Sequence, residues 1–190
     1  MEVIKLFKVG DLIVYGSTGV CEVLDILRLN DKERKFYVLK PLYQSCIIST
    51  PVDTTKVLMR KIISKNEAQQ LVDTIPSIQA EAYHSHDVRQ LEGHYKAYIK
   101  ACDCMELLEL SMSIYEKKQD AISQKRKLGI VDERYMKRAE ELLFGELSAA
   151  LGIPKNEVPE YISERVDGEG KQENGGSSTL FASERRKAIS

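Results

Sequence analysis

Five side chains of types that bind metal ions or act as reactive thiols occur between residues 84 and 104, namely His84, His86, His94, Cys102 and Cys104. Zinc is held by such ligands, and exposed thiols also take part in redox chemistry. The spacings H-x-H and C-x-C do not match those typical of structural zinc sites. We therefore expect free thiols and no metal, and a metal or redox sensor stays open as an alternative.

The motifs of common enzyme classes are absent from the sequence. It contains no P-loop, no G-x-S-x-G, no H-E-x-x-H and no glycine-rich dinucleotide turn. Its carboxylates are scattered through polar segments, where solvated charge is their usual role. We expect a protein that is not an enzyme, with no catalytic residue and no cofactor.

Basic side chains gather in one part of a chain whose formal net charge is only −1. Residues 117–138 hold eight basic and three acidic residues, whereas residues 63–166 as a whole hold 14 basic and 18 acidic ones. This distribution predicts weak, largely non-sequence-specific contact with DNA phosphates, and a merely solvated helical face is the alternative. The candidate DNA-binding side chains are Lys125, Arg126, Lys127, Arg134, Lys137 and Arg138.

The elements that would position these residues begin with strands. The runs DLIVY, VCEVLDILRL, KFYVLKPLY and SCIISTPV in residues 11–52 are rich in β-branched and aromatic residues. Gly16 and Gly19 supply a turn between the first two runs, and Asn30-Asp31 opens a polar loop before the third. About five short strands hide their edges by curling into a small Tudor/SH3-like β-barrel.

Helical signals replace this pattern from Ser64 onward. Ser64 and Glu67 form an S-x-x-E capping box, so we expect a helix to begin there and to end at Pro76. Apolar spacing predicts four more helices. Their expected bounds are about 88–101, from about 105 to the end closed by Leu128-Gly129, from Asp132 as N-cap to Gly152, and a short last helix from Pro154.

The predicted fold class is therefore α+β, with a small N-terminal barrel in residues 1–62 and an all-α part in residues 63–166. The glycine-rich polar run DGEGKQENGGSST predicts a disordered tail over residues 167–190. No run approaches the ~20 apolar residues that span a bilayer. We expect a cytoplasmic protein that does not bind a membrane.

Several ordered motifs resemble the CarD/CdnL family of bacterial RNA polymerase-binding transcription regulators. They are F-K-V-G-D at residues 7–11, V-Y-x-x-x-G-V at 14–20, Y-V-L-K at 37–40, P-V-D at 51–53, R-K-I-I-S at 60–64 and A-E-E-L-L-F-G-E-L-S-A-A-L-G at 139–152. The resemblance extends from Phe7 to about Val166. It implies a Tudor-like domain that docks on the polymerase β subunit, and a helical domain that contacts promoter DNA at the upstream edge of the transcription bubble.

An edge strand of the barrel is the natural docking element, because it can extend a partner's sheet by main-chain hydrogen bonds. We assign this role to the strand at residues 46–50 and to a neighbouring strand around Arg28; the alternative is that these are ordinary core and edge residues. The candidate polymerase-binding residues are Arg28, Cys46, Ile47, Ile48, Ser49 and Thr50. Members of the family often carry an arginine where Ser49 stands.

The family usually presents a tryptophan as a wedge into the minor groove, and this chain has no tryptophan. The loop before the second predicted helix offers Tyr83 and His84 instead, because tyrosine can stack on an exposed base step. A packed or surface tyrosine is the alternative.

The sequence as a whole predicts a regulator that docks on RNA polymerase and modulates the promoter open complex. Two other classes stay open: a protein-interaction adaptor that never contacts DNA, and a Cys/His metal or redox sensor.

Overall fold

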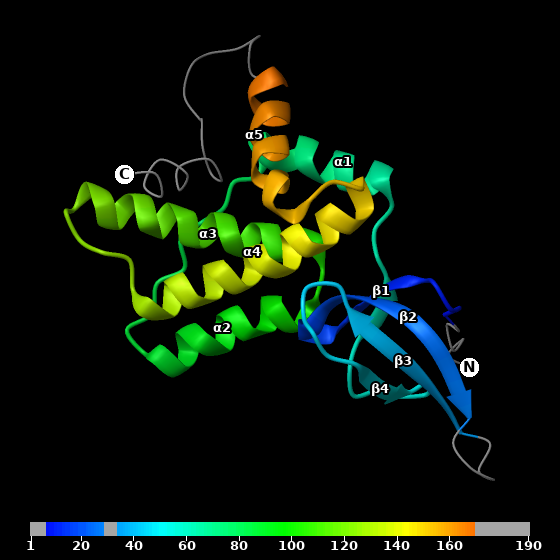
Figure 1. The fold of residues 1–190 in the computed structure, drawn as a ribbon. Helices are drawn as coiled ribbons and strands as arrows, with labels where there is room; N and C mark the ends of the chain where they lie inside the picture. Colours follow the sequence, from blue (N-terminus) through cyan, green and yellow to red (C-terminus); the bar gives the residue numbers. More distant parts are fainter. Residues whose placement is uncertain (1–6, 29–33, 170–190) are drawn as a thin grey trace.

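The computed structural model describes residues 7–28 and 34–169. Within them an antiparallel sheet of five strands is followed by five α-helices, which makes the fold α+β. The sheet lies at one end of the molecule and the helices pack together beside it (Figure 1). Among these residues, no helix combines the length and apolar character needed to cross a bilayer.

The strands of the sheet lie in the order β4-β3-β2-β1-β5. Every neighbouring pair is antiparallel. Strands β4 and β5 are the two ends of this order, and within the described residues no pairing joins them. Closure into a barrel therefore stays a prediction. The strands are β1 Leu12–Tyr15, β2 Gly19–Arg28, β3 Lys35–Pro41, β4 Ile48–Pro51 and β5 Met59–Lys61.

The turn between β1 and β2 is confirmed as the place where glycine is required. Gly16 has φ +46° and Gly19 has φ +90°, and residues with a Cβ rarely adopt such angles. A Cβ on Gly16 would also lie 2.7 Å from a methyl carbon of Val57. The predicted loop at Asn30-Asp31 falls outside the described residues.

Alternation along β3 divides the sheet into two faces. Tyr37 and Leu39 are fully buried and pack with Ile13 and Val23 in a small core. The helices form a second, larger core, in which Leu107, Leu108 and Ile114 of α3 and Leu143 and Leu147 of α4 are almost completely buried. The helices are α1 Lys65–Thr74, α2 Val88–Ala101, α3 Cys104–Ser123, α4 Ile130–Leu151 and α5 Val158–Glu169.

Local capping signals place several helix ends where the sequence predicts them. Ser64 accepts a hydrogen bond from Glu67 N and the Glu67 carboxylate accepts one from Ser64 N, so the capping box is confirmed. Cys102 adopts a left-handed conformation and separates α2 from α3, for which Asp103 is the N-cap. Gly152, with φ +71°, ends α4.

Two predicted helix ends between α3 and α4 are wrong. Helix α3 ends at Ser123, before the basic run, and Lys125 takes the left-handed conformation that was assigned to Gly129. Helix α4 begins at Ile130 with Gly129 as its N-cap, so Asp132 lies inside the first turn. The reason is tertiary: the Asp132 carboxylate is buried and accepts hydrogen bonds from Tyr95 and Lys117 instead of capping its own helix.

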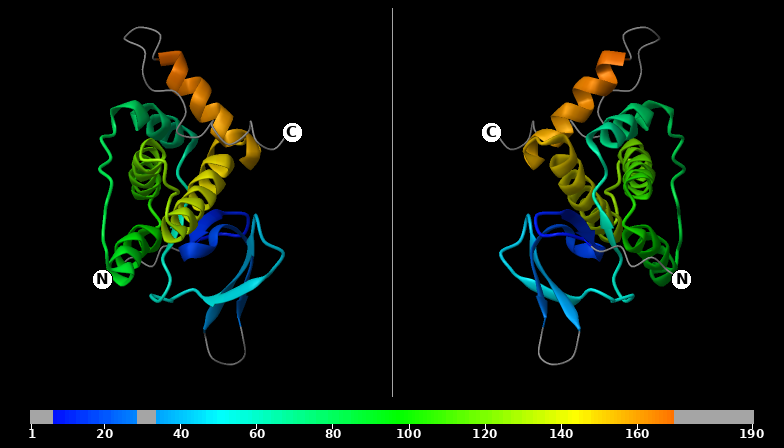
Figure 2. Two further views of the ribbon diagram at one scale, coloured as in Figure 1. Left: turned by 90° about the vertical axis from the view of Figure 1, so that its left-hand side faces the viewer. Right: turned by 90° about the vertical axis from the view of Figure 1, so that its right-hand side faces the viewer.

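The division into residues 1–62 and 63–166 stays a prediction. The chain leaves the last strand at Lys61 and enters the first helix at Lys65. Two further views show the helices lying on one side of the sheet (Figure 2). Helix α5 extends to Glu169, and the remainder of the predicted tail, residues 170–190, falls outside the described residues.

Candidate functional site

Strand β4 is an edge of the sheet, as the proposed docking role requires. In the described residues it pairs with β3 alone, with Tyr37 opposite Thr50 and Val38 opposite Ser49. Val52 N donates to Lys35 O at 3.0 Å, so the alternation of an antiparallel ladder directs the main-chain groups of Ser49 outward. The main-chain carbonyl of Pro51 also points outward, but proline has no N–H to donate. The free edge therefore offers Ser49 as a donor and acceptor.

The predicted polymerase-binding residues are not all on one surface. Cys46, Ile47 and Ser49 are exposed and Ile48 is half-buried. The side chain of Thr50 is buried and accepts a hydrogen bond from Tyr15 Oη at 3.3 Å, so only its main chain lies along β4.

Arg28 does not lie on a neighbour of β4, which corrects the sequence-based pairing. It is the last residue of β2, where it faces Lys35 of β3, and β3 separates β2 from β4. Strands β2, β3 and β4 pair in the order in which they follow one another in the chain, so β3 lies between Arg28 and β4.

The register reveals an apolar surface that the sequence-based residues omit. Leu27 of β2, Phe36 of β3 and Pro51 of β4 lie opposite one another, and Val38 lies beside Ser49. We call these residues, with Ser49, the outer face. Leu27 is 43% exposed, and Phe36, Val38 and Pro51 are half-buried. The signal was present in the alternation of KFYVLKP, where buried Tyr37 and Leu39 leave Phe36 and Val38 on the opposite side.

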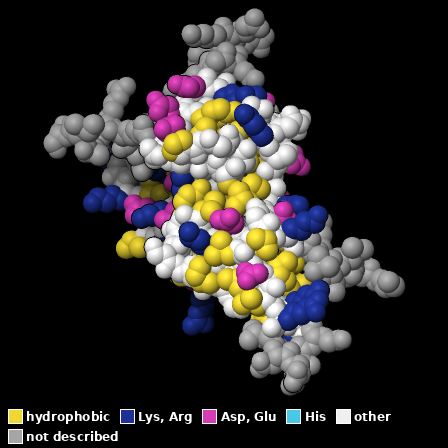
Figure 3. Space-filling view, turned by 45° about the vertical axis from the view of Figure 1, so that its right-hand side comes forward, with side chains coloured by type: hydrophobic (Ala, Val, Ile, Leu, Met, Phe, Trp, Pro, Cys, Tyr) yellow, Lys and Arg dark blue, Asp and Glu magenta, His cyan; other side chains and the backbone are white. Residues whose placement is uncertain are grey.

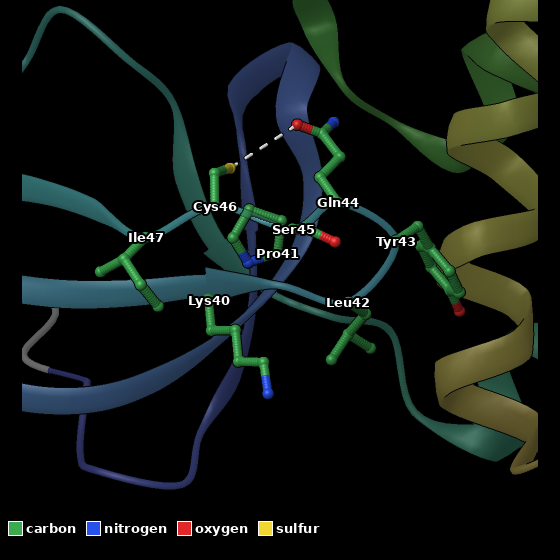
Figure 4. A pocket seen from close by; sticks show the side chains of 8 residues that line it. All are labelled: Lys40, Pro41, Leu42, Tyr43, Gln44, Ser45, Cys46 and Ile47. Atoms are coloured by element: carbon green, nitrogen blue, oxygen red, sulfur yellow. Dashed lines mark hydrogen bonds between the residues drawn. The ribbon is translucent and has the colours of Figure 1, made fainter.

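An open depression of about 720 Å³ adjoins β4 and is formed by the segment from Lys40 to Ile47 (Figure 4). Tyr43 turns away from Ile47 toward α4, where its Oη donates to Gly145 O at 3.1 Å. Lys155 Nζ lies 4.5 Å from the centre of the same ring. Tyr43 therefore anchors the β3–β4 loop on the helices, whereas Cys46 and Ile47 stay exposed next to the docking edge.

The basic run at Lys125, Arg126 and Lys127 lies in the loop between α3 and α4, and all three side chains are exposed. Arg126 donates to Gln124, its near neighbour in the same loop. These three cations are therefore positioned at one end of the helical part, where a phosphate backbone can approach them.

Other basic residues of the predicted cluster are engaged within the protein. Arg134 donates to Glu92 at 2.5 Å, and Arg138 donates to Glu141 at 3.2 Å and also to the carbonyl of Ser17. Lys137 is exposed on α4. The outward charge of this region is therefore smaller than the count of basic residues indicates. On the face shown in Figure 3, Lys and Arg side chains are interspersed with Asp and Glu.

Tyr83 is half-buried and stacks on His94, with ring centres 3.8 Å apart and planes inclined by 19°. His94 also contacts the Tyr98 ring edge-on. Burial lowers the pKa of His94, which favours the neutral imidazole within this group of rings. His84 is exposed in the loop that precedes α2. The structure thus gives Tyr83 a packing partner that a wedge would have to leave.

His84, His86, His94, Cys102 and Cys104 are the candidate metal ligands and reactive thiols. Among the described residues, no three or more His, Cys, Asp or Glu side chains form a group that could hold a metal ion. Burial raises the pKa of Cys104, and it raises the pKa of Cys21 to about 11 with a contribution from Cys46. Reactive thiols have lowered pKa values and access to solvent, so the buried cysteines lack the properties of a redox sensor.

Comparison with known protein families gives a match over the sheet. Residues 7–63 match the model of the CarD-like/TRCF RID domain. A search of curated proteins finds no match. A domain of this type implies interaction with RNA polymerase, through the β subunit in this family. Residues 7–63 of this chain are therefore a domain of the CarD-like/TRCF RID type.

Proposed function

We propose that this chain is a non-enzymatic, cytoplasmic transcription regulator that docks on the RNA polymerase β subunit through β4. Its helices would then contact promoter DNA and modulate the lifetime of the open complex. The observation that supports docking most strongly is the free edge of β4, which lies inside the matched domain.

A strand of the partner can extend the sheet at this edge, because the main chain of Ser49 points outward there. The outer face would add apolar contact, since Leu27, Phe36 and Val38 lie on it and are not fully buried. Burial contributes roughly 25 cal/mol per Å² of apolar surface. Main-chain bonds would fix the register and the outer face would add affinity.

Contact with DNA would be electrostatic and would depend on docking. Non-specific phosphate contacts have dissociation constants of roughly 10⁻⁴ to 10⁻⁶ M. A protein already held on the polymerase can experience an effective DNA concentration near ~1 mM, which gives about nine-tenths occupancy even at the weak end. Lys125, Arg126 and Lys127 are the best-placed cations for this contact, because all three are exposed in one loop.

One observation favours the adaptor as a second candidate function. Arg134 and Arg138 are paired with carboxylates of the same chain, and Lys117 is bound to Asp132. The positive field available for DNA is correspondingly reduced. An adaptor would bind polymerase through β4 and another protein through its helices.

The wedge role of Tyr83 stays a prediction. Phosphate contact is the better supported mechanism, because Tyr83 would have to leave His94, whereas Lys125 and its two basic neighbours are already exposed.

The lifetime of promoter open complexes, measured with the cognate polymerase in the presence and absence of the full chain, tests the proposal. Binding together with a changed lifetime is expected. Binding without a change would favour the adaptor, and absence of binding would overturn docking itself.

A further inference from the structure

A buried carboxylate of α4 holds an arginine of the last strand. Glu146 is only 2% exposed, and its two oxygens accept hydrogen bonds of 2.5 and 2.7 Å from the Arg60 guanidinium of β5. Ile63 N donates to the same carboxylate at 3.0 Å. The pair therefore connects the sheet, the segment that leads to α1, and the C-terminal half of α4.

The same guanidinium also holds the turn between α2 and α3. Arg60 donates to the carbonyl of Cys102 at 2.5 and 3.0 Å, and Cys102 has the left-handed φ of +52°. Burial lowers the pKa of Arg60, but the hydrogen bonds and charge of Glu146 outweigh it and raise that pKa above its ordinary value. The cation is therefore stable in a site that is largely closed to solvent.

Further contacts follow α4 toward its N-terminus. Gly145 O accepts a hydrogen bond from Tyr43 in the β3–β4 loop. A Cβ on Gly19 would lie 3.2 Å from Leu142, which shows how closely the start of β2 approaches this helix. Helix α4 thus contacts the sheet at several separate points, and Arg60 and Glu146 add a largely buried ion pair to these contacts.

We propose that the Arg60–Glu146 pair is an orientation lock that holds the sheet at one fixed angle to the helices. The bidentate geometry is directional, because a planar guanidinium meets a planar carboxylate in one arrangement. The hydrophobic contacts around it are not directional and would tolerate rotation or sliding. If the proposed function holds, a polymerase-docked sheet would present the loop of residues 124–129 in one direction and not over a wide cone.

The lock can be tested on the protein alone, independently of polymerase and DNA. Spin labels are placed at Lys40→Cys in β3 and Glu109→Cys in α3, both exposed positions, in a chain that carries Cys46→Ser because Cys46 is the exposed native thiol. Pulsed electron spin resonance then gives the distribution of distances between the two labels. The test variant is Arg60→Lys, which keeps the charge and removes the bidentate fork.

Arg165→Lys is the matched control, because Arg165 forms a two-point pair with Asp73 that joins α5 to α1 and does not involve the sheet. We expect a narrow distribution in the parent and the control, and one at least about twofold wider in Arg60→Lys. An unchanged width in Arg60→Lys would overturn the lock.

If Arg60→Lys does not fold by circular dichroism, Glu146→Gln replaces it, since the amide keeps the shape of the carboxylate. A distance distribution in Glu146→Gln that is as narrow as in the parent would likewise overturn the proposal. Failure of both variants to fold would show that the pair is required for the fold itself and would also overturn a separate role in orientation.

Discussion

Lys117 Nζ of α3 lies 2.6 Å from Asp132 Oδ1 of α4. This ion pair joins the two helices that the basic loop of residues 124–129 connects. The two side chains are 10% and 8% exposed, and Tyr95 Oη donates to the same carboxylate at 2.6 Å. Lys117 is therefore a structural cation and contributes little to any DNA-facing charge.

Replacing Asp132 with Asn leaves the charge of Lys117 buried without its partner. We expect the free energy of unfolding to fall by about 3 kcal/mol or more, because an unpaired buried charge is strongly destabilising. Urea denaturation measures this change. Glu141→Gln is the control, since it removes an exposed pair with Arg138 and should cost less than about 1 kcal/mol. Similar losses in both variants would contradict the structural role of Asp132.

The effect of Gly145→Ala on stability should depend on whether Tyr43 is present. A Cβ on Gly145 would lie 3.0 Å from the Tyr43 ring, but alanine also favours a helix interior over glycine by about 1 kcal/mol. Gly145→Ala should therefore stabilise a Tyr43→Ala protein and have a smaller or opposite effect in the parent. Thermal unfolding of the parent, the two single variants and the double variant gives the coupling free energy between the two positions. An equal effect in both backgrounds would show that the ring does not constrain Gly145.

His94 predicts a pH dependence of stability. Burial lowers its pKa in the folded protein, so below the unfolded value of about 6.5 the unfolded chain binds more protons than the folded one. Stability contributed by His94 is therefore present at neutral pH and is lost as the pH falls from about 7 to about 5. The parent should lose more stability over this range than His94→Gln does. His86→Gln, at an exposed position, should behave as the parent, and a parent-like slope in His94→Gln would refute the assignment.

The basic loop predicts a salt-dependent promoter effect. Changing Lys125 and Lys127 to Ala should reduce the effect on open-complex lifetime most at low salt and should leave polymerase binding intact. The slope of the logarithm of the DNA-binding constant against the logarithm of the salt concentration should become less negative by up to about 2. Lys65→Ala with Lys100→Ala is the matched control, because it removes the same charge from exposed helical positions elsewhere. Equal responses of the two double variants would remove this loop from the mechanism.

Much of the fold follows from local signals in the sequence. The Ser64–Glu67 capping box, the glycines of the β1–β2 turn and the helix at Val88–Ala101 depend on neighbouring residues, and all three are confirmed. The start of α4 is different, because the tertiary pairing of Asp132 with Lys117 overrides its preference for an N-cap. A single sequence carries no direct signal for such a pairing.

Part of the candidate site could likewise be predicted from the sequence, and part depends on tertiary structure. The sequence placed candidate residues on β4 and in the basic run, because each is one contiguous segment of the chain. The separation of Arg28 from β4 depends on strand order, and the internal pairing of Arg134 and Arg138 depends on helix packing. The outer face required the register of three strands.

Docking through the β4 edge is tested most directly by the affinity of the full chain for purified RNA polymerase. Ser49→Pro removes the one outward N–H identified on this edge, whereas Ser49→Ala keeps it and removes only the hydroxyl. We predict that Ser49→Pro raises the dissociation constant about tenfold or more, equivalent to about 1.4 kcal/mol, while Ser49→Ala stays close to the parent. Parent-like affinity of a folded Ser49→Pro protein would contradict docking by strand addition at β4.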